Sequence, residues 1–398
     1  MIAATDTFLW AAGAPKPAGG AAIDQVIIAT AGAAVASAVV YWLIRRHRGG
    51  GDGLLGRAAE LSGRIGGLPG WAALPTVTAT VSLLVALLGM YWDISLHIDD
   101  GRDAGPLANP AHYLILAGLY GVFVSGVLAM ALPRAGERPG PAPLRLGRDW
   151  HAPIGGLLMA SAGAFALIGF PLDDMWHRLF GQDVTLWGPT HLMLIGGAGM
   201  TLIGQAVLVA EGLSARPGGL GAPLDRAVAI RRVALMGGLL IGLSTFQAEF
   251  DFGVPQFRMV LHPLLIAVAA GVALVAGRLW SGPGGALGAA LFFLLVRGIV
   301  TLFVGPVFGE ATPVMPLYLG EALCVELVAL VLARRPLLFG AVAGAAVGTV
   351  GMATEWPWTH AVFPLPWTGD ILPEGLVLAA VGGAAAGLIG RASCRERV

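Results

Sequence analysis

Charge is scarce in this sequence. Only 12% of its 398 residues are charged, against 56% that are hydrophobic, whereas about a quarter of the residues in soluble domains carry charge. The formal net charge is zero, and no basic patch suggests a nucleic-acid partner. Apolar runs of roughly 20 residues recur instead, each long enough to cross the hydrocarbon core of a bilayer. The composition predicts an all-α, polytopic transmembrane bundle in a lipid bilayer.

Cysteine and lysine are nearly absent. The two cysteines, Cys324 and Cys394, offer no disulfide framework because Cys324 lies inside an apolar run. Lys16 is the single lysine among 24 basic residues, and together with the 60 Gly this bias indicates a GC-rich bacterial genome. The N-terminal stretch MIAATDTFLWAAGAPKPAGG has no basic region, so it is not typical of a cleaved signal peptide. The sequence contains no P-loop, nucleophile elbow or cysteine-rich zinc motif.

The apolar runs predict about eleven membrane spans. They cover residues 22–44, 71–92, 111–133, 151–172, 189–211, 230–249, 259–280, 285–305, 314–333, 336–353 and 371–390. Most arginines fall in one set of loops, and the opposite set holds Lys16, Arg102, Arg178 and Arg258. Because Lys and Arg are enriched in cytoplasmic loops, we expect the N-terminus to lie outside the cytoplasmic membrane of a bacterium.

These spans and loops group into four predicted parts. The parts are an N-terminal span with a Gly-rich cytoplasmic linker (1–70), a duplicated pair of hairpins (71–215), a C-terminal transmembrane bundle (216–388) and a short terminal segment (389–398). The terminal segment reads IGRASCRERV, which resembles the translation of a common sequencing adapter. We therefore expect residues 389–398 to be an artefact rather than natural sequence.

Two loops on the predicted outer side carry the same set of metal-ligand residues. Each copy has an Asp, a His four residues later, and a Pro-x-His further on: Asp93, His97, Pro110 and His112 in the first, and Asp173, His177, Pro189 and His191 in the second. Residues four apart share one face of a helix, and Pro is tolerated in the first turn of the returning helix. Each hairpin is thus expected to gather one carboxylate and two imidazoles, a set that suits copper, zinc or iron.

Further polar residues on the same side are candidates for orienting or extending these sets. Arg102, Asp103 and Asp183 are expected to orient the imidazoles, and Asn109 to cap the helix that follows it. Additional candidates lie at the ends of later spans: Glu249, Asp251, His262, Glu355 and His360. The alternative for all of these positions is an ordinary polar residue at a membrane-interface helix end, and the duplication of an inert hairpin would also produce two matched copies.

Three charged residues fall at membrane depth. They are Arg297, Glu321 and Glu326. Charges at this depth are costly and are usually paired or functional. We expect Arg297 to pair with Glu321 or Glu326 as a structural clamp; a proton path is the alternative.

The two motifs resemble the copper sites in the C subunit of the copper membrane monooxygenases, the family of particulate methane and ammonia monooxygenases. That subunit carries Asp-x3-His, an Arg-Asp pair and Pro-x-His, which in this chain read Asp93, His97, Arg102-Asp103, Pro110 and His112. Its next hairpin has a similar set whose first ligand is Asn, where this chain has Asp173. The resemblance covers about residues 76–211, and a Trp- and Pro-rich stretch at 355–375 is more weakly similar to the end of that family's A subunit.

The resemblance implies a monooxygenase-like oxidoreductase, or a subunit of one, that acts on a small apolar substrate from the extracytoplasmic side. It implies copper as the cofactor, with zinc or iron as alternatives, and a separate cupredoxin-like or other membrane subunit, or a second copy of the chain, as partner. Two other functions stay open: a metal-handling permease and a non-catalytic membrane scaffold. A permease is expected to carry ligands through to the cytoplasmic side, where this sequence has few.

Overall fold

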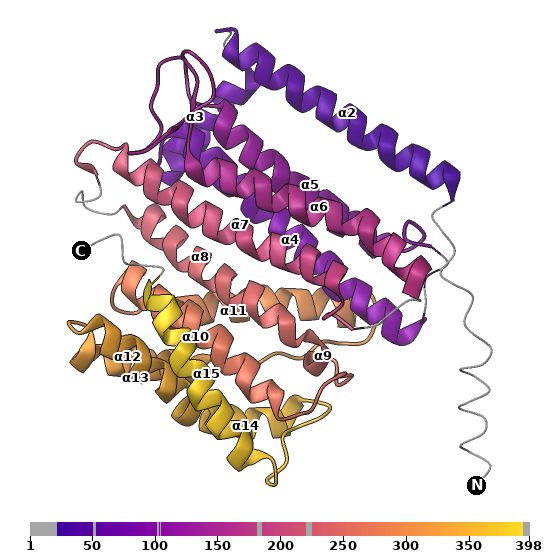
Figure 1. Cartoon of the computed structure of the whole chain (residues 1–398), viewed down its shortest axis with the longest axis vertical. Coiled ribbons are helices and arrows are strands. Elements are labelled where there is room, and N and C mark those ends of the chain that lie inside the picture. Colours follow the sequence, from indigo (N-terminus) through magenta and orange to yellow (C-terminus); the bar gives the residue numbers. More distant parts are fainter. Residues whose placement is uncertain are drawn as a thin grey trace.

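The computed structural model describes residues 22–50, 53–101, 103, 105–180, 185–219 and 225–392. Within these ranges the chain is an all-α bundle (Figure 1), apart from two short antiparallel strands, β1 (Leu144–Arg145) and β2 (His151–Ala152). Ten helical segments of the described part are long and apolar enough to cross a membrane. The predicted fold class, a polytopic helical bundle, is confirmed.

The helices divide into an N-terminal and a C-terminal group. The first group is α2 (Ile23–Arg48), α3 (Leu54–Gly66), α4 (Gly70–Asp99), α5 (Pro110–Ala131), α6 (Ile154–Phe180) and α7 (Pro189–Ser214). The second is α8 (Arg226–Ser244), α9 (Ala248–Asp251), α10 (Leu261–Ser281), α11 (Gly285–Leu302), α12 (Leu319–Leu332), α13 (Pro336–Ala346), α14 (Met352–Val362) and α15 (Leu372–Ala392). A 3₁₀ turn (Thr245–Gln247) follows α8, and π-helical turns follow α11 (Phe303–Val307) and α13 (Val347–Gly351).

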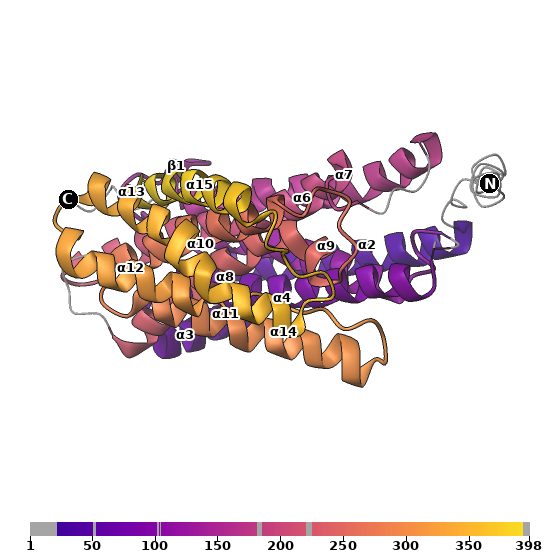
Figure 2. The same cartoon turned by 90° about the horizontal axis from the view of Figure 1, so that it is seen from below.

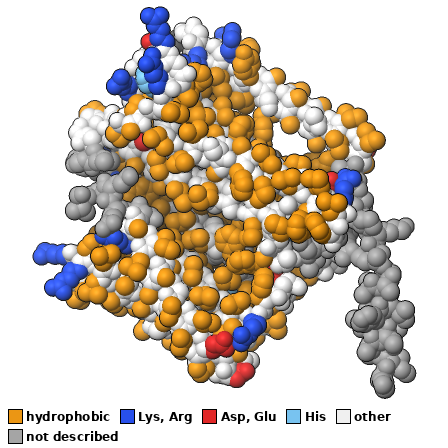
Figure 3. All heavy atoms as spheres, in the orientation of Figure 1, with side chains coloured by type: hydrophobic (Ala, Val, Ile, Leu, Met, Phe, Trp, Pro, Cys, Tyr) orange, Lys and Arg blue, Asp and Glu red, His pale blue; other side chains and the backbone are white. Residues whose placement is uncertain are grey.

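Most of the long helices run in roughly one direction through the molecule (Figure 2). Figure 3 shows a face covered largely by hydrophobic side chains, with charged side chains near its edges. This is the distribution that a bundle surrounded by lipid requires, because a charge in the hydrocarbon core is costly. The helix α2 lies at the outer edge in Figure 1 and contains no buried residue.

The hairpins α4–α5 and α6–α7 repeat one another in their packing contacts. Gly118 of α5 lies against Ala86 of α4, and Gly197 of α7 lies in the same way against Ala166 of α6. Both glycines follow the second motif His by six residues, and both alanines precede the motif Asp by seven. A Cβ at either glycine would overlap the neighbouring backbone, so the small residue allows the close approach. The repeat therefore extends well beyond the ligand positions.

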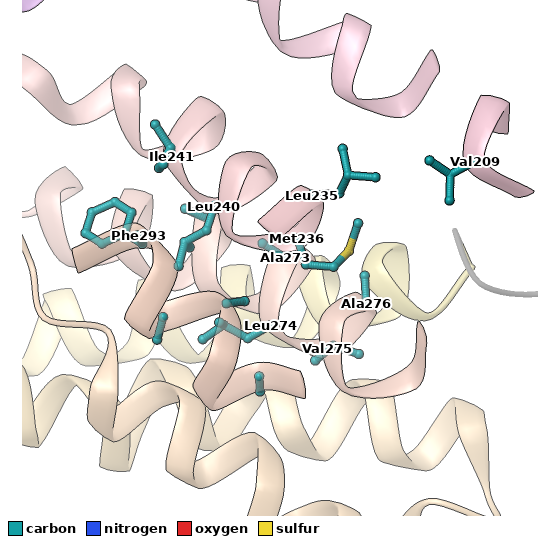
Figure 4. Close-up of a cluster of buried hydrophobic side chains, with 14 of the residues drawn as sticks. Val209, Leu235, Met236, Leu240, Ile241, Ala273, Leu274, Val275, Ala276 and Phe293 are labelled. Atoms are coloured by element: carbon teal, nitrogen blue, oxygen red, sulfur yellow. The ribbon is translucent and has the colours of Figure 1, made fainter. Parts of the chain in front are cut away.

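A shared hydrophobic core holds the C-terminal helices together (Figure 4). Leu240 of α8, Leu274 of α10 and Phe293 of α11 are each fully buried in it. Leu235 and Ile241 of α8 belong to the same core and also line the large cavity described below. Packing against α10 and α11 thus fixes the position of α8, which forms one wall of the cavity.

The ninth predicted span, residues 314–333, is wrong as a continuous membrane-crossing helix. The helix α12 has only 14 residues, and residues 309–318 before it are not helical. Backbone groups at membrane depth must still be hydrogen-bonded. Here Glu355 accepts two backbone N–H groups of this irregular segment, at 2.9 and 2.7 Å. A side chain distant in sequence therefore replaces the missing helical hydrogen bonds.

Two further boundary predictions need correction or restriction. The predicted Gly-rich linker between the first two spans contains the helix α3, whose buried Leu55 and Ala59 belong to the main hydrophobic core. Residues 389–392 of the predicted artefact continue α15 without a break, and residues 393–398 lie outside the described residues.

Candidate metal centre

The first hairpin gathers four ligand-type side chains. The helix α4 presents Asp93 and His97 on its last two turns, α5 presents His112 as its third residue, and the loop between them supplies Asp103. The Oδ1 atom of Asp93 lies 2.9 Å from Nε2 of His112 and 3.4 Å from Nε2 of His97. The Oδ2 atom of Asp103 lies 3.8 and 3.6 Å from the same two nitrogens. Sequence reasoning assigned Asp103 an orienting role, but the structure places it among the ligand atoms.

The second hairpin builds a similar cluster from Asp173 and His177 on α6 and His191 on α7. The two imidazole Nε2 atoms lie 3.1 Å (His177) and 3.4 Å (His191) from the carboxylate oxygens of Asp173. The imidazole ring centroids are 5.6 Å apart, compared with 6.4 Å for His97 and His112. In each cluster the ligand atoms all lie within 4.8 Å of one another.

Backbone carbonyls orient the imidazoles of His97, His112 and His191. The Nδ1 atoms of His112 and His191 donate to the carbonyls six residues earlier, those of Pro106 at 2.6 Å and Thr185 at 2.7 Å. The Nδ1 atom of His97 donates to a loop carbonyl at 3.0 Å. A carbonyl can only accept, so the hydrogen sits on Nδ1 and the neutral ring turns a lone pair on Nε2 toward the carboxylate. The lone pair on Nε2 and the lone pairs of the carboxylate oxygen repel one another unless a metal cation or a proton lies between the two atoms.

The spacing of these atoms fits a metal ion. Ligand nitrogen and oxygen atoms each bind zinc at about 2.0–2.2 Å, so two ligands of one tetrahedral or octahedral ion lie roughly 3.0–3.4 Å apart. The separations of 2.9 to 3.8 Å in the first cluster and 3.1 to 3.4 Å in the second lie close to that range. The carbonyl-bound Nδ1–H groups are also what metal-binding histidines usually have. Both clusters therefore offer imidazole and carboxylate ligands with room for a further group on the ion.

The two clusters differ in the polar residues that support the carboxylates. Asn109 caps α5, as predicted, by accepting the N–H of Ala111 at 2.9 Å. Its amide also donates to Asp93 at 2.6 Å and to Asp103 at 3.2 Å. In the second hairpin the hydroxyl of Thr190 donates to Asp173 instead. Two predicted orienting residues, Arg102 and Asp183, lie outside the described residues.

Glu249 supports the second cluster from another helix without belonging to it. One of its oxygens accepts the hydroxyl of Thr185 and the backbone N–H of Leu186, both at 2.8 Å. The other accepts the N–H of Gln256, also at 2.8 Å. Because the carbonyl of Thr185 holds the Nδ1 atom of His191, this carboxylate fixes the loop that orients a ligand. The sequence predicted Glu249 only as a candidate orienting residue or extra ligand, and no motif indicated its contact with this loop.

The remaining candidates lie elsewhere in the molecule. Asp251 forms a fully buried ion pair with Arg297 at 2.9 Å. The predicted pairing of Arg297 with Glu321 or Glu326 is therefore wrong, and Glu326 pairs with Arg278 at 2.8 Å. The chain brings Asp251 and Arg297 together from distant helices, which the sequence pattern does not reveal.

His262, Glu355 and His360 are also separate from the clusters. His262 is fully buried, stacks on Phe250, and its Nδ1 accepts the indole N–H of Trp367 at 2.9 Å. Glu355 binds the irregular segment before α12. His360 is exposed and donates to the carbonyl of its own helix four residues earlier, at 2.9 Å. None of the three lines the cavity that the clusters share.

Both clusters face one cavity of about 840 Å³. It is lined by all seven cluster residues and by apolar side chains of α4, α7 and α8. His191 lies close enough to Asp93 for the two groups to interact electrostatically, so the clusters are neighbours. Acidic residues lie beyond the end of α4, where desolvation and the charges of Asp100 and Asp99 raise the pKa of Glu310. Negative charge beside the clusters favours the arrival of cations.

Comparisons of the chain with protein-family models, with curated proteins and with solved structures found no match. The two clusters and the cavity are therefore the features of the chain that indicate a function.

Proposed function

We propose that the chain is an integral membrane metalloprotein that binds one metal ion in each hairpin. The observation that carries this proposal is the convergence of imidazole Nε2 atoms on Asp93 and on Asp173, at distances of 2.9 to 3.4 Å, at the head of a largely apolar cavity. We place the clusters on the extracytoplasmic side of a bacterial cytoplasmic membrane, because the arginine-rich loops lie at the opposite ends of the helices.

We further propose copper as the metal and a monooxygenase-like oxidation as the activity. Imidazole suits copper, and copper binds most tightly among the common divalent ions of the first transition series, with zinc and iron as alternatives. Asp93, His97, Asp103 and His112 would hold one ion and Asp173, His177 and His191 the other. The bound metal would supply redox chemistry toward dioxygen, and the reaction would require an electron donor outside this chain, which a partner subunit would provide.

The chain's own residues would perform three tasks in this activity. The backbone carbonyls of Pro106 and Thr185 hold imidazoles in the tautomer that leaves Nε2 free. The amide of Asn109 orients both carboxylates of the first cluster. The apolar cavity wall keeps an apolar substrate beside the clusters and limits access of water.

A permease and a scaffold are the competing functions, and one experiment separates all three. Protein reconstituted into phosphatidylcholine vesicles is exposed to radioactive copper, and bound metal and metal inside the vesicles are counted. The proposal predicts retained, stoichiometric copper without entry into the vesicle. Entry that saturates with copper concentration would establish a permease, and absence of both binding and entry would establish the scaffold, in which protonated imidazoles replace the metal.

A further inference from the structure

The cavity below the clusters is larger than two metal ions require. Its volume of about 840 Å³ lies near the upper end of the roughly 300–1,000 Å³ typical of ligand pockets. Apolar side chains make most of its wall, among them Leu84 and Leu87 of α4 and Ile195 and Leu202 of α7. A cavity of this volume and apolar lining fits a long apolar chain better than a small molecule of only a few atoms.

One positive charge lies at the far end of the cavity. Arg231 is the only Lys or Arg among the described residues that line it, and it sits beside Gly66, just before α4 begins. Its Nη1 atom is buried without a hydrogen-bond partner, and no described carboxylate pairs with the guanidinium. The adjacent Arg232 is different, because it lies over the ring of Trp280 and donates to the carbonyl of that residue. Arg231 is therefore a partly buried cation at the cavity, with a buried Nη1 atom that has no hydrogen-bond partner.

The length of the cavity along α8 is close to that of an acyl chain. Arg231 and Thr245 both line the cavity, and the helical path between them rises roughly 20 Å at about 1.5 Å per residue. One leaflet contributes about half of the roughly 30 Å hydrocarbon core of a bilayer. A single acyl chain of about 15 Å, together with the length of the Arg231 side chain, would thus extend most of the way from the backbone of Arg231 to Thr245.

We propose that the cavity binds a fatty carboxylate, with its head group at the Arg231 guanidinium and the end of its chain beside the two clusters. A guanidinium donates two parallel hydrogen bonds to a carboxylate, and such a ligand would give the buried Nη1 atom of Arg231 the hydrogen-bond partner that it lacks. The role of this ligand as a substrate rests on the proposed function, whereas its binding does not.

The first test blocks the cavity. A Cβ at Gly199 of α7, which lines the cavity, would meet no heavy atom of neighbouring elements within 4 Å, so Gly199→Leu extends into open space. Gly196 on the same helix is equally free of contacts but does not line the cavity, so Gly196→Leu is the matched control. Palmitate binding to the purified chain in detergent is titrated by native mass spectrometry. We expect Gly199→Leu to weaken binding about tenfold or more and Gly196→Leu to leave it unchanged.

The second test removes the head-group contact. Arg231→Gln should lower palmitate affinity about tenfold or more, to the level of the uncharged hexadecanol. Arg226→Gln, on an exposed residue of the same helix that does not line the cavity, should have no effect. Phosphatidylglycerol is added as a competitor, because an anionic phospholipid offers the same charge on a larger molecule, and it should displace palmitate poorly.

Three results would overturn the inference. They are equal binding of palmitate and hexadecanol by the unaltered chain, binding that Gly199→Leu does not change, and displacement by phosphatidylglycerol as effective as by palmitate itself. The outcome is independent of the metal, since palmitate titration of the unaltered chain after treatment with a metal chelator should give the same affinity as before the treatment. If the chain binds palmitate but binds no metal, the proposed function alone is refuted. If the chain binds metal but does not bind palmitate, this inference alone is refuted.

Discussion

Asp93 and Asp251 are both aspartates with hydrogen-bonding partners inside the bundle, yet the structure uses them differently. Asp93 accepts a hydrogen bond from the amide of Asn109, and the Nε2 atoms of His97 and His112 lie close to it. In the neutral imidazoles, the lone pairs on these Nε2 atoms face the lone pairs of the carboxylate. Asp251 receives a guanidinium, which already neutralises it. The four-residue spacing to a His revealed the first role in the sequence. The role of Asp251 depends on Arg297, far along the chain, and no local sequence pattern predicts this ion pair.

The buried pair provides a prediction about stability. Arg297→Met leaves the Asp251 carboxylate without its counter-ion, and we expect the free energy of unfolding to fall by about 3–5 kcal/mol, as for other broken buried pairs. The double variant Asp251→Leu/Arg297→Met removes both charges and should recover most of this loss. Unfolding in detergent with increasing denaturant measures both effects. A single variant as stable as the unaltered chain would contradict the clamp.

At the scale of helices and loops, apolar runs located the spans well but failed at residues 314–318, which belong to the non-helical segment 309–318. The reason is physical: this segment satisfies its backbone with Glu355 and with other side chains rather than with its own helix. Pro-x-His, in contrast, is a local signal, and both α5 and α7 begin at that proline. The sequence could not predict that the backbone carbonyls of Pro106 and Thr185 orient imidazoles, because every residue has a backbone carbonyl and its position depends on the fold.

The loop before α7 carries the second prediction. In the unaltered chain, the two carboxylate oxygens of Glu249 accept hydrogen bonds from three donors. Glu249→Gln keeps the volume of the side chain but leaves only one acceptor oxygen for these donors. The loosened Thr185 carbonyl would hold His191 less firmly, so the metal affinity of the second cluster should fall about 10- to 100-fold.

The first cluster serves as the internal control for this variant, because Glu249 makes no contact with its loop among the described residues. Competition with a chelator, read separately for His97→Ala and His177→Ala backgrounds, resolves the two sites. Equal weakening of both clusters would show that Glu249 acts on the fold in general rather than on His191.

For the whole molecule, the sequence predicted the all-α bundle and the pair of related hairpins, and the equivalent glycine contacts support that repeat. It did not predict the shared cavity, since the residues that line it come from helices of both groups and are distant in the sequence. Membrane orientation follows from arginine distribution alone and stays a prediction.

Orientation can be tested with single cysteines in a chain whose Cys324 and Cys394 are replaced by alanine. Ala108 is exposed in the loop of the first cluster, and Ala135 is exposed in the loop at the other end of α5. A membrane-impermeant thiol reagent added to intact cells should label Ala108→Cys and should label Ala135→Cys only after lysis. The reverse pattern would place the clusters in the cytoplasm.

The central claim is that each hairpin holds its own metal ion, and elemental analysis of protein purified from its membrane tests it most directly. We predict two metal ions per chain, one in His97→Ala, one in His177→Ala and none in the double variant, with His360→Ala unchanged as a control outside the clusters. Loss of metal on mild acidification should accompany this result, because protons compete for the same imidazole and carboxylate atoms. A folded chain that contains no stoichiometric metal, or a double variant that retains it, would contradict the account.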